Sequence, residues 1–140
     1  MSKSPYVTEI KGKQHFERLL ADTEKPVIID FWAPWCGPCK MQGPVFEATA
    51  KELHEQVVFA KLNTEAVPAL AKAFNVSSIP SLLVLSQGEV VDARIGLTNK
   101  AQLVTMLQRA LDKQNHVGFF AKVKRLFAGN AEATPTAPAA

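Results

Sequence analysis

The chain has 140 residues, of which 47% are hydrophobic and 21% charged, and this composition suits one globular domain with a buried core. Residues 1–112 carry twelve Lys or Arg and twelve Asp or Glu, so the net charge of +3 lies entirely in residues 113–140. A neutral body argues against nucleic-acid binding by the domain itself, because such binding needs a basic surface.

The start of the chain shows no targeting signal. No apolar h-region follows the first residues, and no run of the sequence approaches the roughly 18 apolar residues that a membrane span needs. We therefore expect a cytoplasmic protein, in a compartment where thiols are kept reduced. Paired cysteines in that setting are more often catalytic or metal-binding than structural.

From about residue 6 onward, the sequence alternates between short β-tending runs and helical patterns. The strands are predicted near residues 6–10, 27–32, 57–62, 81–85 and 90–95, and the helices near residues 14–21, 36–55, 67–74 and 100–113. The last two strands should form an antiparallel hairpin around Gln87-Gly88. The alternation predicts an α/β fold with a parallel core sheet, right-handed crossovers and helices on both faces.

The run at 27–32 is apolar on both faces, which is typical of a central strand. Asp30 is its only charged residue. In the helix that follows, Pro38 suits the first turn, and Pro44 should kink the helix. Gly43 costs up to about 1 kcal/mol relative to Ala inside a helix, so we expect the kink to be loose.

Both cysteines of the chain, Cys36 and Cys39, stand two residues apart where this strand meets the helix. Unpaired backbone N–H groups and the positive end of the helix dipole favour a thiolate at the first of them. We therefore expect Cys36 to be the exposed nucleophile that forms a mixed disulfide with a substrate. Cys39, one turn further along, would then resolve that disulfide.

The resolving step needs a proton acceptor, and Asp30 is the candidate. A buried carboxylate without a full partner has a raised pKa, which suits proton transfer near neutral pH. Lys61, near the end of the next strand, is a plausible charge partner. The alternative is that Asp30 and Lys61 form an ion pair of structural importance only.

Two other uses of the cysteines have to be weighed. A structural zinc site usually needs four ligands, and beyond the two cysteines only the scattered His15, His54 and His116 are available. A purely structural disulfide across two residues would add little stability, because the loop that it closes is so short. We therefore expect no metal.

The segment at 30–41, DFWAPWCGPCKM, resembles the active-site segment of the thioredoxin family. The resemblance continues, in family order, through residues 60–63, 79–81, 87–90 and 96, and it covers about residues 5–112. It implies a thioredoxin fold, with a central mixed sheet of about five strands flanked by helices on both faces. It also implies a monomeric protein-disulfide reductase that works through a redox-active Cys36–Cys39 pair, without a bound cofactor.

The resemblance further assigns partners and contact residues. Electrons would come from NADPH through a thioredoxin reductase, and the substrates would be proteins that contain disulfides. Pro80 would be a cis-proline, and the backbone of Ile79 would pair with the substrate. Trp35, which could otherwise be a core residue, would join Ile79 and Gly96 in a flat apolar surface around Cys36. The family associates the intervening Gly37-Pro38 with reductants.

The C-terminal segment is different in kind. We expect residues 1–113 to form the thioredoxin domain and residues 114–140 to form an extension. In it, residues 116–128 predict a short basic amphipathic helix, and the residues after it are rich in Ala and Pro. The helix could contact a membrane surface weakly, dock on a partner or fold back on the domain. A redox-independent interaction module is the alternative function for the whole chain.

Overall fold

In the part of the chain that the structure describes, five strands form one mixed sheet in the order β1-β3-β2-β4-β5. β1, β3 and β2 are parallel, whereas β4 pairs antiparallel with both β2 and β5. The strands are β1 (Val7–Glu9), β2 (Val27–Trp32), β3 (Val58–Asn63), β4 (Ser81–Ser86) and β5 (Glu89–Ile95). The computed structural model describes residues 4–127, with side chains described for 4–114. The predicted α/β architecture and the terminal hairpin are confirmed.

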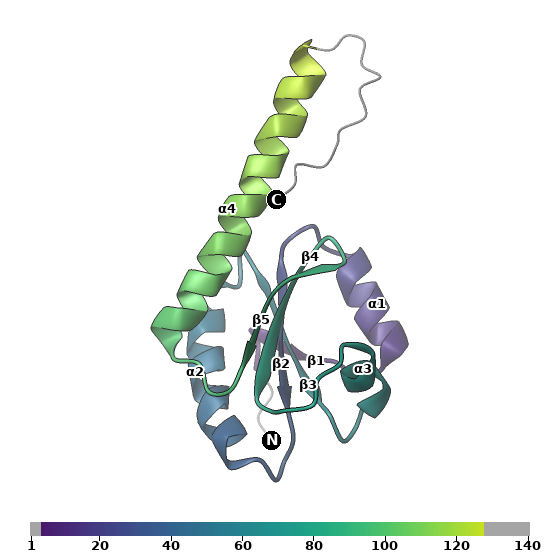
Figure 1. Cartoon of the computed structure of the whole chain (residues 1–140), viewed down its shortest axis with the longest axis vertical. Helices are drawn as coiled ribbons and strands as arrows, with labels where there is room; N and C mark the ends of the chain where they lie inside the picture. Colours follow the sequence, from purple (N-terminus) through teal and green to yellow (C-terminus); the bar gives the residue numbers. More distant parts are fainter. Residues whose placement is uncertain (1–3, 128–140) are drawn as a thin grey trace.

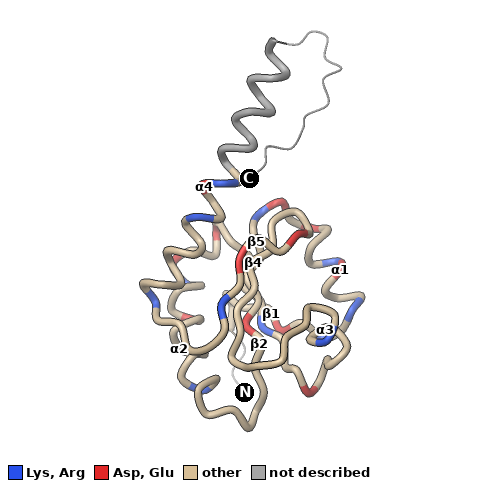
Figure 2. The backbone as a smooth tube through the Cα atoms, viewed as in Figure 1, with Lys and Arg blue, Asp and Glu red and all other residues tan. Residues whose placement is uncertain are grey.

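Among the described residues, four helices cover the sheet: α1 (Lys13–Ala21), α2 (Gly37–Leu53), α3 (Pro68–Ala73) and α4 (Lys100–Phe127). Figure 1 shows α2 and α4 on one face of the sheet and α1 and α3 on the other. Acidic and basic positions are interspersed along the described chain (Figure 2). Within residues 4–127, no helix combines the length and apolar character that crossing a bilayer demands.

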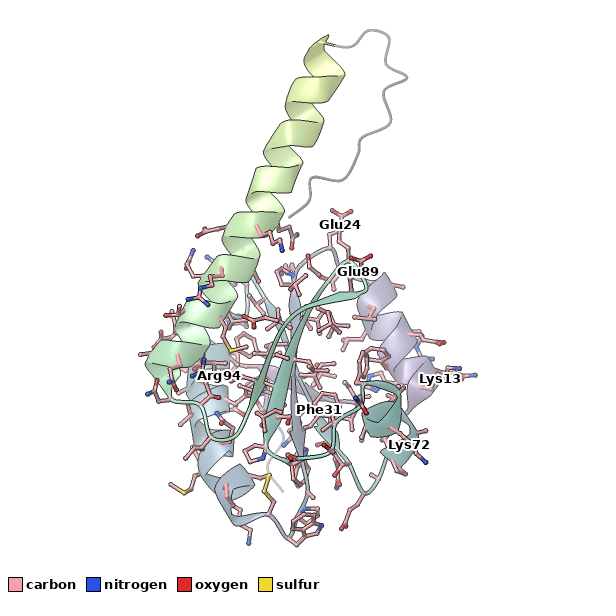
Figure 3. All side chains as sticks on the ribbon, in the orientation of Figure 1. Lys13, Glu24, Phe31, Lys72, Glu89 and Arg94 are labelled. Carbon is pink, nitrogen blue, oxygen red and sulfur yellow. A yellow bond between two sulfur atoms is a disulfide. The ribbon has the colours of Figure 1, made fainter. Side chains whose placement is uncertain are left out.

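The sheet separates two hydrophobic clusters, and the alternation of side chains along β2 assigns each residue to one of them. Ile29 and Phe31 pack in the cluster under α1 and α3, with Phe16 and Leu70. Figure 3 shows Phe31 inside the molecule, with Lys13 and Lys72 pointing outward. Ile28 packs on the opposite face. Asp30, two residues later, therefore also faces α2 and α4.

The cluster under α2 and α4 holds the site-bearing helix in place. Phe46 of α2 contacts Phe59 of β3 edge to face, with ring centroids 5.3 Å apart. Leu103 and Leu107 of α4 belong to the same cluster and are fully buried. The helix α2 is thereby held against the sheet and beside α4.

The chain differs from the prediction at α4, which continues to Phe127 as one helix, whereas the sequence pattern predicts an end near Lys113 and a new helix from about residue 116. Its start is fixed by a capping box: the Asn99 side chain accepts from the Gln102 N–H at 2.8 Å, and the Gln102 side chain accepts from the Asn99 N–H at 3.0 Å. No proline follows to stop the helix before residue 127. The apolar and basic faces of 116–128 and the Ala/Pro tail lie outside the described side chains.

Replacement of Phe46 tests how α2 is held. Phe46 is 1% exposed, so Phe46→Ala should lower the free energy of unfolding by about 3–5 kcal/mol in urea titrations. Met41 lies on the same helix and is 62% exposed, so Met41→Ala should change that free energy by no more than about 0.5 kcal/mol. Equal losses in the two variants would contradict this packing.

Candidate active site

The two cysteines lie at the first turn of α2, directly after β2, and are joined by a disulfide with their Cα atoms 5.2 Å apart. Cys36 is the N-cap residue, and its Sγ accepts a hydrogen bond from the Cys39 N–H at 3.2 Å. Pro38 lies in the first turn, where its missing N–H leaves no donor unpaired. The helix terminus thus directs a backbone N–H at the first sulfur.

The expectation that Cys36 is exposed is wrong for this disulfide form. Cys36 is 3% exposed and Cys39 is 6% exposed. The reason is that the Cys36 sulfur turns back over the helix terminus, where it bonds to Cys39 and accepts from its N–H. The neighbouring Pro34, Gly37 and Pro38 are exposed instead. A partner must therefore contact the surrounding loop to reach the sulfur.

Asp30 lies beneath this disulfide and is 4% exposed. Its Oδ1 has no hydrogen-bond partner among the described residues. Burial raises the pKa of Asp30 from 3.8 to about 7, the positive charge of Lys61 lowers this pKa, and the negative charge of Glu9 raises it. The pKa of this carboxyl therefore lies well above the ordinary value for an aspartate and near neutral pH.

Lys61 is the register partner of Asp30 on β3, so both side chains leave the same face of the sheet. Its Nζ, however, pairs with the Glu9 carboxylate at 3.7 Å and lies 5.5 Å from the centre of the Trp32 ring. Within the described chain no Asp30–Lys61 ion pair forms. Lys61 therefore acts on Asp30 through its field and does not neutralise it by direct contact.

A cavity of about 220 Å³ connects these groups, since Asp30, Lys61, Cys39 and Trp32 all line it. Trp32 contributes a buried indole N–H that, like Asp30 Oδ1, is without a partner among the described residues. Asp30 and Trp32, which carry this acceptor and this donor, thus share the lining of the cavity with the second cysteine. It is large enough to hold water.

The predicted contact residues gather at the same edge of the sheet. The Ile79–Pro80 bond is cis, as the resemblance implies, and it directly precedes β4. Ser81 is in register with Phe31, so this bond lies beside the end of β2. The Gly96 N–H donates to Pro80 O at 2.8 Å, and Gly96 has a φ of 98°, which favours glycine.

Trp35 is 67% exposed, which confirms the prediction that it lies on the surface. Its indole N–H donates to the carboxylate of Glu65, which holds the ring beside the loop. The sequence reasoning missed Ile95 and Leu97, two exposed apolar side chains on either side of Gly96. An apolar residue at the exposed end of a strand is the signal that could have found them.

Glu9 was missed as well, and only the parallel register of β1 with β3 brings it opposite Lys61. Within residues 4–127, no group of three or more His, Cys, Asp or Glu side chains is arranged to hold a metal ion. The site therefore consists of a disulfide, a buried carboxyl with its two charged neighbours, and an exposed apolar surface.

Comparison with known proteins agrees with this description. The family model described as Thioredoxin matches residues 7–109. A thioredoxin of Synechocystis is 37% identical over 111 residues, which are 79% of this chain and 100% of that protein. Thioredoxin C-3 of Corynebacterium nephridii is 42% identical over 103 residues, 74% of this chain and 70% of its own. The solved structure of a mutant thioredoxin from Halobacterium salinarum has a TM-score of 0.69 and 30% identity, covering 78% of this chain and 95% of its own.

The raised pKa of Asp30 predicts a characteristic pH dependence of stability. The folded chain holds the Asp30 proton more tightly than the unfolded chain, whose pKa is near 3.8, so a rising pH favours unfolding. The free energy of unfolding should fall between about pH 4 and pH 7 by at most roughly 4 kcal/mol, and then level off. Urea titrations of Asp30→Asn should lack this fall. A variant that keeps the wild-type slope would contradict the assignment.

The two charged neighbours should shift the pKa of Asp30 in opposite directions. Glu9→Gln removes a negative charge and should lower this pKa, whereas Lys61→Met removes a positive charge and should raise it. The carboxyl ¹³C chemical shift of Asp30, followed by NMR against pH, measures both effects. Glu17→Gln, an exposed residue of α1 on the other face of the sheet, is the control and should leave the pKa unchanged. Shifts of the same sign in the first two variants would overturn this account.

Proposed function

Because the chain belongs to the thioredoxin family and reduces protein disulfides by dithiol–disulfide exchange, we propose distinct roles for its two cysteines. Cys36 is the attacking thiolate, and Cys39 is the resolving thiol. The observation that carries this proposal is the hydrogen bond from the Cys39 N–H to Cys36 Sγ at the start of α2. A hydrogen-bond donor stabilises a thiolate more than a thiol, and here the Cys39 N–H donates to the sulfur of Cys36.

The reaction proceeds in two balanced steps. The Cys36 thiolate attacks one sulfur of the substrate disulfide, whose bond breaks, and the departing substrate thiolate takes up a proton. The Cys39 thiolate then attacks Cys36 Sγ, and the second substrate sulfur leaves as a thiolate, which is protonated in turn. The substrate has gained two electrons and two protons overall. The chain is left with the Cys36–Cys39 disulfide.

Asp30 is the proton acceptor for Cys39 in this scheme. Both residues line the same cavity, and a pKa of about 7 lets the carboxyl accept and release a proton at neutral pH. Water in the cavity is a suitable carrier between the carboxyl and the thiol. Lys61 and Glu9 tune the carboxyl and do not touch the reacting sulfur atoms.

The substrate contacts the exposed apolar surface around the disulfide. Trp35 contributes the largest exposed side chain, Ile79 offers its backbone before the cis bond, and Gly96 leaves room for close approach. Gly37 and Pro38 stand between the cysteines in the first turn of α2 and are exposed as well. The arrangement suits extended protein segments of varied sequence, because backbone and apolar contacts dominate it.

Electrons return to the disulfide from NADPH through a thioredoxin reductase, and the protein works as a cytoplasmic monomer. These assignments are supported by the membership of the family and by bacterial relatives that match most of the chain. The segment 116–128 adds a weak contact to a membrane surface or a partner, which rests on its sequence pattern alone.

Two serine variants separate the roles of the cysteines. Cys36→Ser should abolish the reduction of insulin by NADPH and a bacterial thioredoxin reductase, because the attacking thiolate is gone. Cys39→Ser should still attack but stop at a mixed disulfide, visible as a covalent insulin adduct by mass spectrometry and released by dithiothreitol.

Three results would contradict these roles: an adduct with Cys36→Ser, normal turnover with Cys39→Ser, or no turnover of the wild type with either a cognate or a bacterial reductase. A double Cys36→Ser/Cys39→Ser variant that keeps its role in the cell would favour the redox-independent interaction module instead.

A further inference from the structure

A fully buried glutamine lies one helical turn beyond the redox pair. Gln42 of α2 is 0% exposed, as is Thr98 in the segment between β5 and α4. The Gln42 side-chain N–H donates to Thr98 O at 3.0 Å, and its side-chain oxygen accepts from the Thr98 N–H at 2.8 Å. The side-chain amide of Gln42 therefore forms hydrogen bonds with both the backbone N–H and the backbone carbonyl of a residue that is 56 positions away.

Hydrogen bonds continue from Thr98 to the contact surface. The Thr98 hydroxyl donates to Gly96 O at 3.2 Å, and the Gly96 N–H donates to Pro80 O at 2.8 Å. The helix that carries Cys36 and Cys39 is thus connected through Gln42 to the segment at 96–98, and through that segment to the cis-proline. These are the three parts of the chain from which the contact surface is built.

Packing alone does not account for a glutamine here. The sequence predicts that Gly43 loosens α2, but the buried amide of the adjacent Gln42 ties the helix to the segment at 96–98. An apolar side chain of the same length would fill this position without desolvating an amide. It could not, however, satisfy the N–H and the carbonyl of Thr98. Two hydrogen bonds of opposite polarity to one residue fix both its distance and its orientation.

We infer that Gln42 is a positioning residue that holds the segment at 96–98 in register with the disulfide and thereby sets the affinity for protein substrates. This inference rests on the proposed contact surface around Gly96. Gln42 does not reach the sulfur atoms through any of its hydrogen bonds, so the intrinsic reactivity of the pair stays independent of it.

The test uses pre-reduced full-length protein, so that no reductase enters the measurement. Stopped-flow fluorescence follows its oxidation by increasing concentrations of insulin, and separately by 5,5′-dithiobis(2-nitrobenzoate), a small disulfide that needs little of the surface. In Gln42→Met the half-saturating insulin concentration should rise roughly 3- to 10-fold, the range expected for losing such hydrogen bonds. The limiting rate with insulin and the rate with the small disulfide should stay within about twofold.

Thr49→Val is the matched control. Thr49 lies on the same helix, is fully buried, and donates its hydroxyl to Val45 O within α2 at 2.8 Å. Loss of the Thr49 hydroxyl removes a hydrogen bond within α2 without releasing the segment at 96–98. The half-saturating insulin concentration should therefore not change. An equal change in both variants, an unchanged Gln42→Met, or an equal change with insulin and the small disulfide would overturn the inference.

Ile95→Ser separates this inference from the proposed surface, because Ile95 is 74% exposed beside Gly96. If Ile95→Ser raises the half-saturating insulin concentration and Gln42→Met does not, only the role of Gln42 is contradicted. If neither variant raises that concentration, the proposed contact surface is contradicted as well. Should Gln42→Met not fold, amide hydrogen exchange of the wild type decides. Strong protection of the Thr98 N–H supports the pair of hydrogen bonds between Gln42 and Thr98, and rapid exchange contradicts it.

Discussion

The strand β2 is hydrogen-bonded on both edges, to β3 and to β4, and this constraint fixes the rest of the site. A strand held on both sides cannot slip, so the direction of every side chain along it is set. The end of β2 leads into the start of α2, where the disulfide forms. Its antiparallel neighbour β4 begins at the same edge, which brings the cis bond at Ile79–Pro80 beside that end. One fixed strand thus aligns the disulfide, the buried carboxyl and the proposed contact surface.

The same strand carries a buried carboxyl that costs the fold stability. A carboxyl at Asp30 is buried without a hydrogen bond to one of its oxygens, and its positive neighbour is engaged by Glu9. A well-paired Asp30 would make the fold more stable, but its pKa would lie far below neutral and it would hold a proton poorly. The arrangement is consistent with stability given up at one position for proton transfer there.

Much of this could be predicted from the sequence, because hydrophobic periodicity and turn residues are local signals. They predicted the order of the elements, and the isolated Asp30 in an apolar strand marked the buried carboxyl. The features that were missed depend on pairs of residues distant in the chain. The register of β1 with β3 brings Glu9 to Lys61, and a helix and a loop meet at Gln42 and Thr98. The burial of Cys36 was missed for another reason, since it follows from the geometry of the helix terminus after the disulfide has formed.

The balance of charge over residues 1–112 has a consequence for how partners are found. Acidic and basic positions are interspersed in the described chain (Figure 2), so the domain generates little long-range field of one sign. Encounter is then governed by diffusion and by the fit of the apolar surface, not by electrostatic steering. Association with acidic and with basic proteins would proceed at comparable rates, and ionic strength would have little influence on either. Such indifference to charge would suit the proposed reduction of protein segments of varied sequence.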